Sequence, residues 1–308
     1  MLSGVRVGSF ARGEFKLRFG IIADAHLGPT GTNFPPVLGF PSVPYEYERS
    51  DAIMRYRHAL RRCVQEDVDG LLLLGDLSWS GDRESLEVGV RLAAKTGRPV
   101  WTVSGNHDCG ERVDALARAV RWIRADNVRL ATLEGEMVGK ELRIAGMSVT
   151  SENWGYTARS GGKPDVSGWG GDLVMWLSHY PMISFEEKAS QAGLYYGDND
   201  LEDLEEAARP LLERSGPTVV VNGHMHMRDA CVVGEVLQVS CAALTQPPFE
   251  VTFLDFERKG EQITVRRESV SVAPFPDDVY LPVLSPPKQE WIFEAGMWCS
   301  VEAAELRK

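Results

Sequence analysis

Short apolar runs that end in glycine or a polar residue recur along the chain. The run of four leucines at residues 71–74 lies between Gly70 and Gly75, and Asp76 follows it directly. A continuous apolar run of this length is typical of a strand that is buried on both faces of a sheet. In open α/β sheets, ligands bind at the carboxyl ends of the parallel strands. The pattern therefore predicts a central parallel strand that brings a carboxylate to a functional edge.

Further strands and helices are predicted from the same alternation of apolar and polar segments. Strands are expected at residues 17–23, 99–103, 128–133, 141–149, 172–178 and 217–221. Helices are expected after Ser50, which we interpret as an N-cap, and at residues 82–95, 112–125 and 201–212. Strands that alternate with helices at this rhythm predict right-handed βαβ units, so we expect an α/β fold.

The pattern changes in the last quarter of the chain. Residues 230–240 and 251–270 alternate between apolar and polar positions around turns, which predicts hairpins. The tail from Ala273 is rich in proline and tryptophan and shows no clear periodicity. We therefore divide the chain into a domain at residues 1–272 and an extension at residues 273–308 that packs on the domain or on a partner.

Two loops contain many aromatic residues, at positions 29–49 and 152–171. Long loops in compact domains are usually functional or disordered. The first loop leaves directly from the expected functional edge, so it is a candidate for shaping a substrate site. A surface insertion is the alternative.

Composition and charge argue against one class of function, the binding of nucleic-acid polymers. Hydrophobic residues make up 44% and charged residues 25% of the 308 residues, as in an ordinary folded protein with a sizeable core. The formal net charge of -11 argues against a groove for a nucleic-acid polymer, which needs clustered lysine and arginine.

The chain shows no targeting or redox signal. Residues 1–16 lack the apolar core of a signal peptide, and no apolar run approaches the roughly 20 residues of a membrane-spanning helix. We therefore expect a cytoplasmic protein that does not enter a membrane. The cysteines are odd in number and scattered, which argues against a disulfide framework or a thiolate zinc site. They are Cys63, Cys109, Cys231, Cys241 and Cys299.

Five of the six histidines lie at the carboxyl ends of predicted strands, beside carboxylates. His58 is the exception, and we expect it to be exposed or structural. Mixed imidazole and carboxylate ligands suit Mn, Fe or Zn better than Mg or Ca. The residues at the strand ends are Asp24 with His26, Asp76, Asn106 with His107 and Asp108, His179, and His224 with His226.

The ordered set D-x-H, G-D, G-N-H-D, H and G-H-x-H resembles the calcineurin-like metallophosphoesterase superfamily. The resemblance implies a four-layer α-β-β-α sandwich with a dinuclear metal site at the carboxyl ends of the strands. It assigns Asp24, His26 and His226 to one metal ion. It assigns Asn106, His179 and His224 to the other, with Asp76 as the bridge between the two ions.

The resemblance also implies a mechanism, in which a hydroxide that bridges the two metal ions attacks phosphorus. His107 takes the place of the family's histidine near the leaving group, as general acid or as a transition-state stabiliser. We expect Asp108 to orient His107, although it could instead cap the following helix. Gly105 and Gly223, like Gly75, are expected to allow tight turns at crowded strand ends.

Departures from subfamily patterns guide the choice of phosphoester. Residues 75–81 lack the arginine that protein Ser/Thr phosphatases of this superfamily carry, and the G-N-H-D motif ends in Asp108 and not in glutamate. The spacing is similar to that of small bacterial phosphodiesterases of the cyclic-nucleotide type. DNA-repair nucleases share the D-x-H-L-G motif, but the acidic charge disfavours them.

We therefore expect a phosphodiesterase that acts on a small, nucleotide-like or other organic molecule. A phosphomonoesterase with the same centre is the second interpretation, and a non-catalytic interaction module on this fold is the third. The oligomeric state is left open.

Overall fold

The computed structural model describes residues 14–28, 49–110, 113–151, 158–194, 200–275 and 281–301. Two large sheets form the central layers of this part of the chain. The first contains β1 (Phe15–Ile22), β2 (Gly70–Leu73), β3 (Val100–Thr102), β6 (Val128–Leu130), β15 (Glu250–Lys259), β16 (Gln262–Ser271), β17 (Lys288–Glu294) and β18 (Met297–Val301). The second contains β7 (Glu136–Val138), β8 (Leu142–Met147), β11 (Leu173–Ser178), β12 (Thr218–Asn222), β13 (Asp229–Val233) and β14 (Val236–Ser240).

Shorter strands and five helices complete the described part. The short strands are β4 (Cys109–Gly110) with β5 (Val113–Asp114), and β9 (Val149–Ser151) with β10 (Ala158–Ser160). The helices are α1 (Arg49–Gln65), α2 (Arg83–Ala94), α3 (Ala115–Ile123), α4 (Glu186–Gln191) and α5 (Leu204–Leu212).

The leucines around β2 show how the sequence builds the layers. Leu72 and Leu74 belong to the core between the two sheets, whereas Leu71 and Leu73 belong to the core under α1, α2 and α3. This division follows from the period of two along a strand, which sends successive side chains to opposite faces. A run of four leucines is therefore needed because both faces of this strand are covered.

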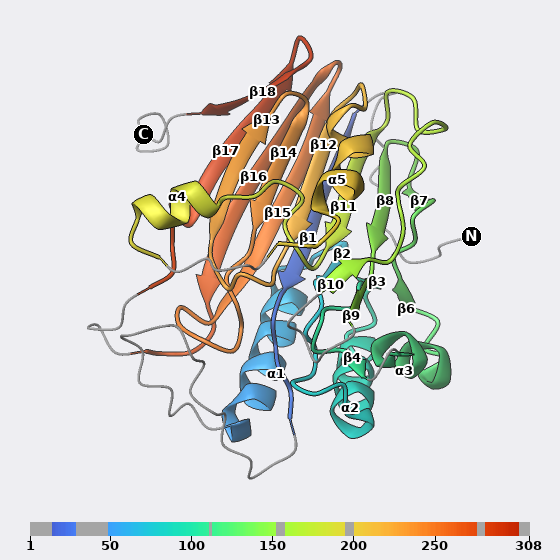
Figure 1. Ribbon diagram of the computed structural model, residues 1–308, viewed down its shortest axis with the longest axis vertical. Coiled ribbons are helices and arrows are strands. Elements are labelled where there is room, and N and C mark those ends of the chain that lie inside the picture. Colours follow the sequence, from blue (N-terminus) through green and yellow to red (C-terminus); the bar gives the residue numbers. More distant parts are fainter. Residues whose placement is uncertain are drawn as a thin grey trace.

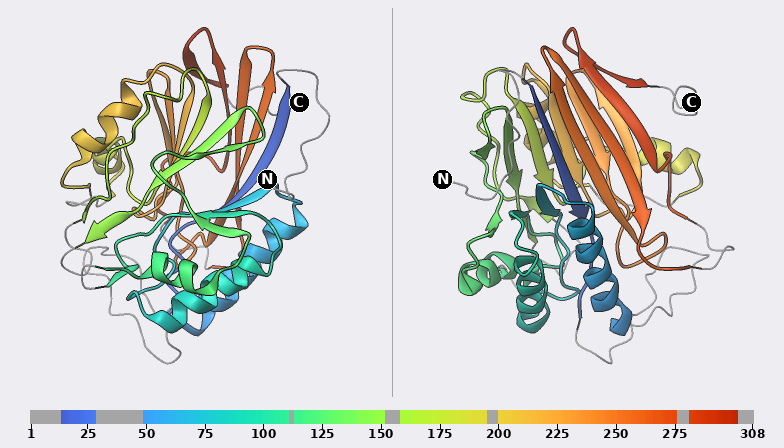
Figure 2. Two further views of the ribbon diagram at one scale, coloured as in Figure 1. Left: turned by 90° about the vertical axis from the view of Figure 1, so that its right-hand side faces the viewer. Right: turned by 180° about the vertical axis from the view of Figure 1, so that it is seen from behind.

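Helices cover the outer faces of both sheets. The helices α1, α2 and α3 pack on the first sheet, and α5 packs on the second through Ala207, Ala208 and Leu211. In Figure 1 α5 lies in front of the second sheet, and the view from behind in Figure 2 brings β1 and the first sheet toward the viewer. The predicted four-layer α-β-β-α sandwich is thus confirmed.

The strands that carry candidate site residues run parallel within each sheet. In the first sheet β1 pairs parallel with β2, β2 with β3, and β3 with β6. In the second sheet β11 pairs parallel with β8 and with β12. The expected βαβ units are therefore present, and the carboxyl ends of these strands meet at one edge of the sandwich.

Two helix starts differ from the prediction. The helix α1 begins at Arg49, so Ser50 lies within it and is not its N-cap. The helix α3 begins at Ala115 and not near residue 112, since the side chain of Asp114 accepts a hydrogen bond from Ala117 N at 2.7 Å. Asp108 does not provide the cap of α3 that we considered as its alternative role. The helix α2 was expected to start at residue 82, and Asp82 is its N-cap.

The tail forms a hairpin that the sequence pattern did not predict. The strand β17 pairs with β16, and β18 pairs with β17, which places the hairpin at one edge of the first sheet. Trp291 and Trp298 are buried there, whereas the neighbouring positions of these strands are partly or fully exposed. The division of the chain at residue 272 stays a prediction.

A buried group of charged residues lies where the tail meets the two sheets. We call Arg228, Asp229, Glu250 and Arg267 the arginine cluster. Arg228 pairs with Glu250, and its Nε donates to the carbonyl of Ser285 at 3.0 Å. Arg267 donates from Nη1 to the carbonyl of Asp229 at 2.8 Å and from Nη2 to Ser285 Oγ at 2.8 Å. The cluster thereby ties the tail to β13 and β16.

Other expectations have mixed outcomes. His58 is exposed, as expected. The cysteines in the described residues are free thiols, and Cys63, Cys109 and Cys241 are buried. Within the described residues, no helix is both long and apolar enough to cross a membrane. Residues 29–48 and 152–157 lie outside the described residues, so a role for those parts of the two loops stays a prediction.

Candidate metal centre

The predicted ligands come together at the carboxyl edge of the sandwich. The ends of β1, β2 and β3 in the first sheet supply four of them, and the ends of β11 and β12 in the second sheet supply three. We call these seven residues the strand-end cluster. Its members are Asp24, His26, Asp76, Asn106, His179, His224 and His226.

Backbone hydrogen bonds hold the loops after β1 and β2 side by side. The amide of His26 donates to the carbonyl of Asp76 at 2.9 Å, and the amide of Leu27 donates to the carbonyl of Leu77 at 2.8 Å. The pairing of the two strands thus continues into the residues that carry the functional side chains. This pairing of the loops sets how far Asp24 and His26 lie from Asp76.

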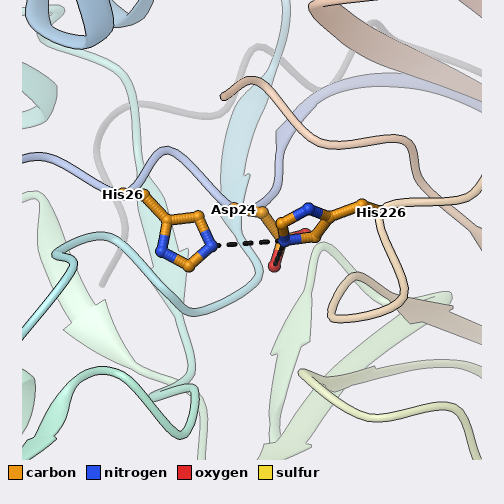
Figure 3. A group of neighbouring side chains, drawn as sticks. All are labelled: Asp24, His26 and His226. Carbon is orange, nitrogen blue, oxygen red and sulfur yellow. Dashed lines mark hydrogen bonds and ion pairs between the residues drawn. The ribbon is translucent and has the colours of Figure 1, made fainter. Parts of the chain in front are cut away.

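One group of potential ligands consists of Asp24, His26 and His226, whose side chains point toward one another in Figure 3. His26 Nε2 lies 3.2 Å from His226 Nε2, and His226 Nε2 lies 3.4 Å from Asp24 Oδ1. The carboxylate of Asp24 also accepts a hydrogen bond from the backbone amide of His224 at 3.1 Å. This hydrogen bond joins the loop after β1 to the loop after β12 and so holds the two loops in position relative to each other.

A second group consists of Asp76, His179 and His224. His179 Nε2 lies 3.2 Å from His224 Nδ1, and it lies 3.0 Å from the amide oxygen of Asn106. The other ring nitrogen of His179, Nδ1, lies 2.7 Å from the carbonyl of Leu74. Since a carbonyl can only accept, this contact places a proton on Nδ1 and turns Nε2 toward the cluster.

The carboxylate of Asp76 lies between the two groups. Its Oδ2 is 3.6 Å from His26 Nε2 and 3.2 Å from His179 Nε2. Two cations that are held close together need a shared anion between them. Asp76 occupies the position that such a bridge requires.

The backbone at these strand ends adopts a conformation that non-glycine residues rarely adopt. Nine described non-glycine residues have a positive φ, and five of them belong to the strand-end cluster. Each such residue costs about 1–3 kcal/mol and persists when the surrounding structure fixes it. The five are Asp24 (52°), His26 (43°), Asp76 (48°), His224 (66°) and His226 (55°).

The crowding explains two of the expected glycines. A Cβ atom on Gly105 would lie 2.2 Å from Asp76 Oδ1, and a Cβ atom on Gly223 would lie 2.6 Å from Asp24 Oδ2. Any side chain at either position would push a carboxylate out of the cluster.

Comparison with known proteins identifies the family. The family model described as calcineurin-like phosphoesterase matches residues 17–228, which is more than half of the chain. The chain belongs to the calcineurin-like phosphoesterase family. Its predicted membership is thereby confirmed.

Solved structures with a similar fold extend this comparison. A dimetal phosphatase from Danio rerio is 12% identical, with 83% of this chain and 99% of that chain covered and a TM-score of 0.52. A protein of Thermus thermophilus is 10% identical, with 83% of this chain and 99% of that chain covered and a TM-score of 0.48. At such low identity the likeness to the first of these shows a shared fold. No curated protein matches the chain significantly.

The residues of this calcineurin-like phosphoesterase fit a dinuclear centre. The cluster offers carboxylate and amide oxygens together with imidazole nitrogens, a donor set that suits Mn, Fe or Zn. In each group two imidazole nitrogens face each other at 3.2 Å, which a shared cation satisfies. Among the described residues no lysine or arginine forms an ion pair with Asp24 or Asp76. The assignment of particular ligands to each of the two metal ions stays a prediction.

Burial and charge act differently on the histidines of the centre. Burial lowers the pKa of His26 well below its ordinary value, although the charge of Asp76 raises it. A lowered pKa favours the neutral ring, which is the form that binds metal ions. Burial also lowers the pKa of His179, but the charge of Asp76 and a hydrogen bond with it outweigh burial and raise the pKa to about 9.

His107 lies beside these two groups, and with His26 and Asp76 it forms a third group of potential ligands. Its backbone amide donates to Asp76 Oδ1 at 2.9 Å, and its ring nitrogen Nδ1 lies 2.6 Å from the carbonyl of Trp79. That contact places a proton on Nδ1 and leaves Nε2 for a ligand of the site. The orienting partner that the structure shows for His107 is thus the carbonyl of Trp79, and not Asp108 as we expected.

Asp108 connects the two neighbouring loops. Its buried carboxylate accepts hydrogen bonds from the amides of Ser78 at 2.9 Å, Leu77 at 3.2 Å and Gly105 at 3.2 Å. Burial and the charge of Asp76 raise the pKa of Asp108 to about 7, although these amide donors lower it. Through these bonds Asp108 acts on the positions of Asp76 and Gly105, and its catalytic role stays a prediction.

Sequence reasoning missed three residues that contact the centre. Gln246 forms a hydrogen bond with His226, Tyr180 stacks on the ring of His224 with 3.7 Å between centroids, and the indole of Trp79 lies beside His107. Tyr180 follows His179 directly, and Trp79 follows the G-D motif, so proximity to a motif could have indicated both. Gln246 lies in the connection between β14 and β15, where no motif points to it.

Proposed function

We propose that this protein is a metal-dependent phosphodiesterase that acts on a small organic phosphodiester. The observation that carries the proposal is the position of Asp76, whose Oδ2 lies within 3.6 Å of one histidine from each group of potential ligands. A site built around one shared carboxylate suits two-metal hydrolysis of a phosphoester. Family membership supports the same chemistry.

The chain's own residues divide the work in this proposal. The strand-end cluster holds two metal ions, Mn, Fe or Zn, with Asp76 shared between them. Bound metal ions supply positive charge for the phosphate oxygens and lower the pKa of water. His107 lies beside the cluster, and with Nδ1 donating to the carbonyl of Trp79 its imidazolium form can donate a hydrogen bond or a proton from Nε2 to the departing oxygen.

A diester substrate is favoured by charge. A phosphodiester carries one negative charge near neutral pH, whereas a monoester carries up to two. Residues 75–81 lack the arginine that clamps phosphate in protein phosphatases of the superfamily, and the net charge is -11. A small, singly charged substrate is therefore easier to accept than a monoester or a nucleic-acid polymer. A cytoplasmic location is part of the same proposal.

The test is hydrolysis of bis-p-nitrophenyl phosphate beside p-nitrophenyl phosphate, with protein that has been stripped by a chelator and reloaded with Mn²⁺. We expect turnover of the diester to exceed that of the monoester and to disappear in the stripped protein. A faster monoester reaction would replace the proposal with a phosphomonoesterase. If neither substrate is hydrolysed and elemental analysis finds no bound metal, the remaining interpretation is a non-catalytic interaction module on this fold.

A further inference from the structure

Trp79 lies at the rim of the centre and contacts two of its histidines. Its ring centroid is 4.7 Å from that of His107 at an interplanar angle of 36°, and 5.2 Å from that of His26 at 61°. Its backbone is fixed as well, because its amide donates to the carbonyl of Leu27 at 2.8 Å and its carbonyl faces His107 Nδ1. The indole is therefore held in one place beside the centre.

The exposure of the site residues shows where a ligand can enter. Asp24, Asp76 and His179 are buried, with at most 2% of their surface exposed. Trp79 and His107 are half-buried, as are the two histidines that follow β12. Among the site residues that the structure describes, these half-buried side chains are the ones that a ligand from solvent can contact first, and the indole has the largest carbon surface of the four.

We propose that Trp79 is a substrate-contacting residue, whose indole binds the organic group of the phosphoester on the side of the site where His107 lies. This proposal rests on the proposed function. A polar site that binds the phosphate group needs an apolar surface for the rest of the substrate, and an aromatic face supplies it with little loss of conformational entropy. The substrate class is thus phosphoesters with an aromatic or other flat group, such as a nucleobase.

A purely structural role for Trp79 is the alternative that the experiment has to separate. In that role the indole would only support the ring of His107, and its loss would weaken the binding of every phosphate-like ligand equally. In the proposed role its loss weakens only ligands that carry an aromatic group. Phenylphosphonate and methylphosphonate present the same charged head group and differ in this group alone.

The experiment measures the binding of both phosphonates to the Mn²⁺-loaded protein by titration calorimetry. The variant Trp79→Leu keeps an apolar side chain but removes the ring, and the control Trp79→Phe keeps a ring. We expect the wild-type protein to bind phenylphosphonate at least about 5-fold more tightly than methylphosphonate. Trp79→Leu should abolish this preference with little change for methylphosphonate, and Trp79→Phe should retain most of it.

Three results would overturn the inference: no preference in the wild-type protein, an unchanged preference in Trp79→Leu, or an equal loss of affinity for both phosphonates. Loss of bound metal in both variants, measured by elemental analysis, would also overturn it, because the indole would then support the centre itself. Failure of the proposed function looks different, since the hydrolysis assay of the wild-type protein detects it as a faster monoester reaction or as turnover of neither test ester.

Discussion

The strand-end cluster and the arginine cluster are both buried and charged, yet they differ in what balances their carboxylates. In the arginine cluster Glu250 pairs with the guanidinium of Arg228, and Arg267 is held by carbonyl groups of the chain. In the strand-end cluster Asp24 and Asp76 face histidines only, within the described residues. The arginine cluster contains the positive side chains that balance its carboxylates, whereas the strand-end cluster is suited to bind metal cations.

This difference separates a structural polar cluster from a binding site. A buried ion pair that is complete within the chain contributes to the fold, and removing one partner is strongly destabilising. Carboxylates that converge with imidazole nitrogens and have no lysine or arginine partner lower their energy by binding metal ions. Burial and charge alone would not distinguish the two clusters, but the identity of the partners does.

The largest effect is expected from Asp76→Asn, which removes the shared charge of the strand-end cluster. Both metal ions should be lost and kcat should fall at least about 1,000-fold, because one residue serves both ions. Elemental analysis and the diester assay measure this. The matched control is Asp229→Asn, which makes the same change at a buried carboxylate of the arginine cluster. This variant should keep the metal ions of the strand-end cluster. Metal retention in Asp76→Asn would refute the bridging role.

His107→Ala should have a smaller effect on turnover and none on metal content. We expect kcat to fall by about 100- to 10,000-fold, the usual range for loss of a general acid or base, while two metal ions stay bound. His58→Ala, the same change at an exposed histidine, serves as the control and should match the wild-type protein. If His107→Ala lost metal as Asp76→Asn does, our division between ligands and catalytic residue would be wrong.

Arg267→Met should affect stability and leave turnover per folded molecule almost unchanged. The change leaves the carbonyls of Asp229 and Pro286 without their buried donor, so the free energy of unfolding should fall by about 3–5 kcal/mol. Denaturant unfolding and active-site-normalised kcat measure the two quantities. A loss of bound metal at full folding would show that the arginine cluster also supports the metal centre, and the contrast between the clusters would fail.

Much of the fold and of the centre was predictable because short-range patterns decide it. The leucines at 71–74 specify a strand with two buried faces, and parallel strands must end at a common edge, so Asp24, Asp76 and His179 could be placed together. The glycines beside them were predictable for the same reason, since crowding at that edge excludes a Cβ atom.

The features that were not predicted depend on contacts between distant segments. The hairpin β17–β18 lies at a sheet edge, so only Trp291, Phe293 and Trp298 are buried and the period of two is masked by polar neighbours. The contact between Gln246 and His226 joins two connections whose approach only the folded sheets define. The partner of His107 was missed because a backbone carbonyl, that of Trp79, has no signature in the side-chain sequence.

The position of β1 in the middle of the first sheet has a consequence for biosynthesis. This strand pairs with β2 on one side and with β15 on the other, so Ile21 lies opposite Thr252. During translation β1 therefore leaves the ribosome long before its second neighbour exists, with one edge open to wrong pairing. The metal centre begins directly after this strand, so we expect it to assemble only late in synthesis, and nascent chains to depend on chaperones until then.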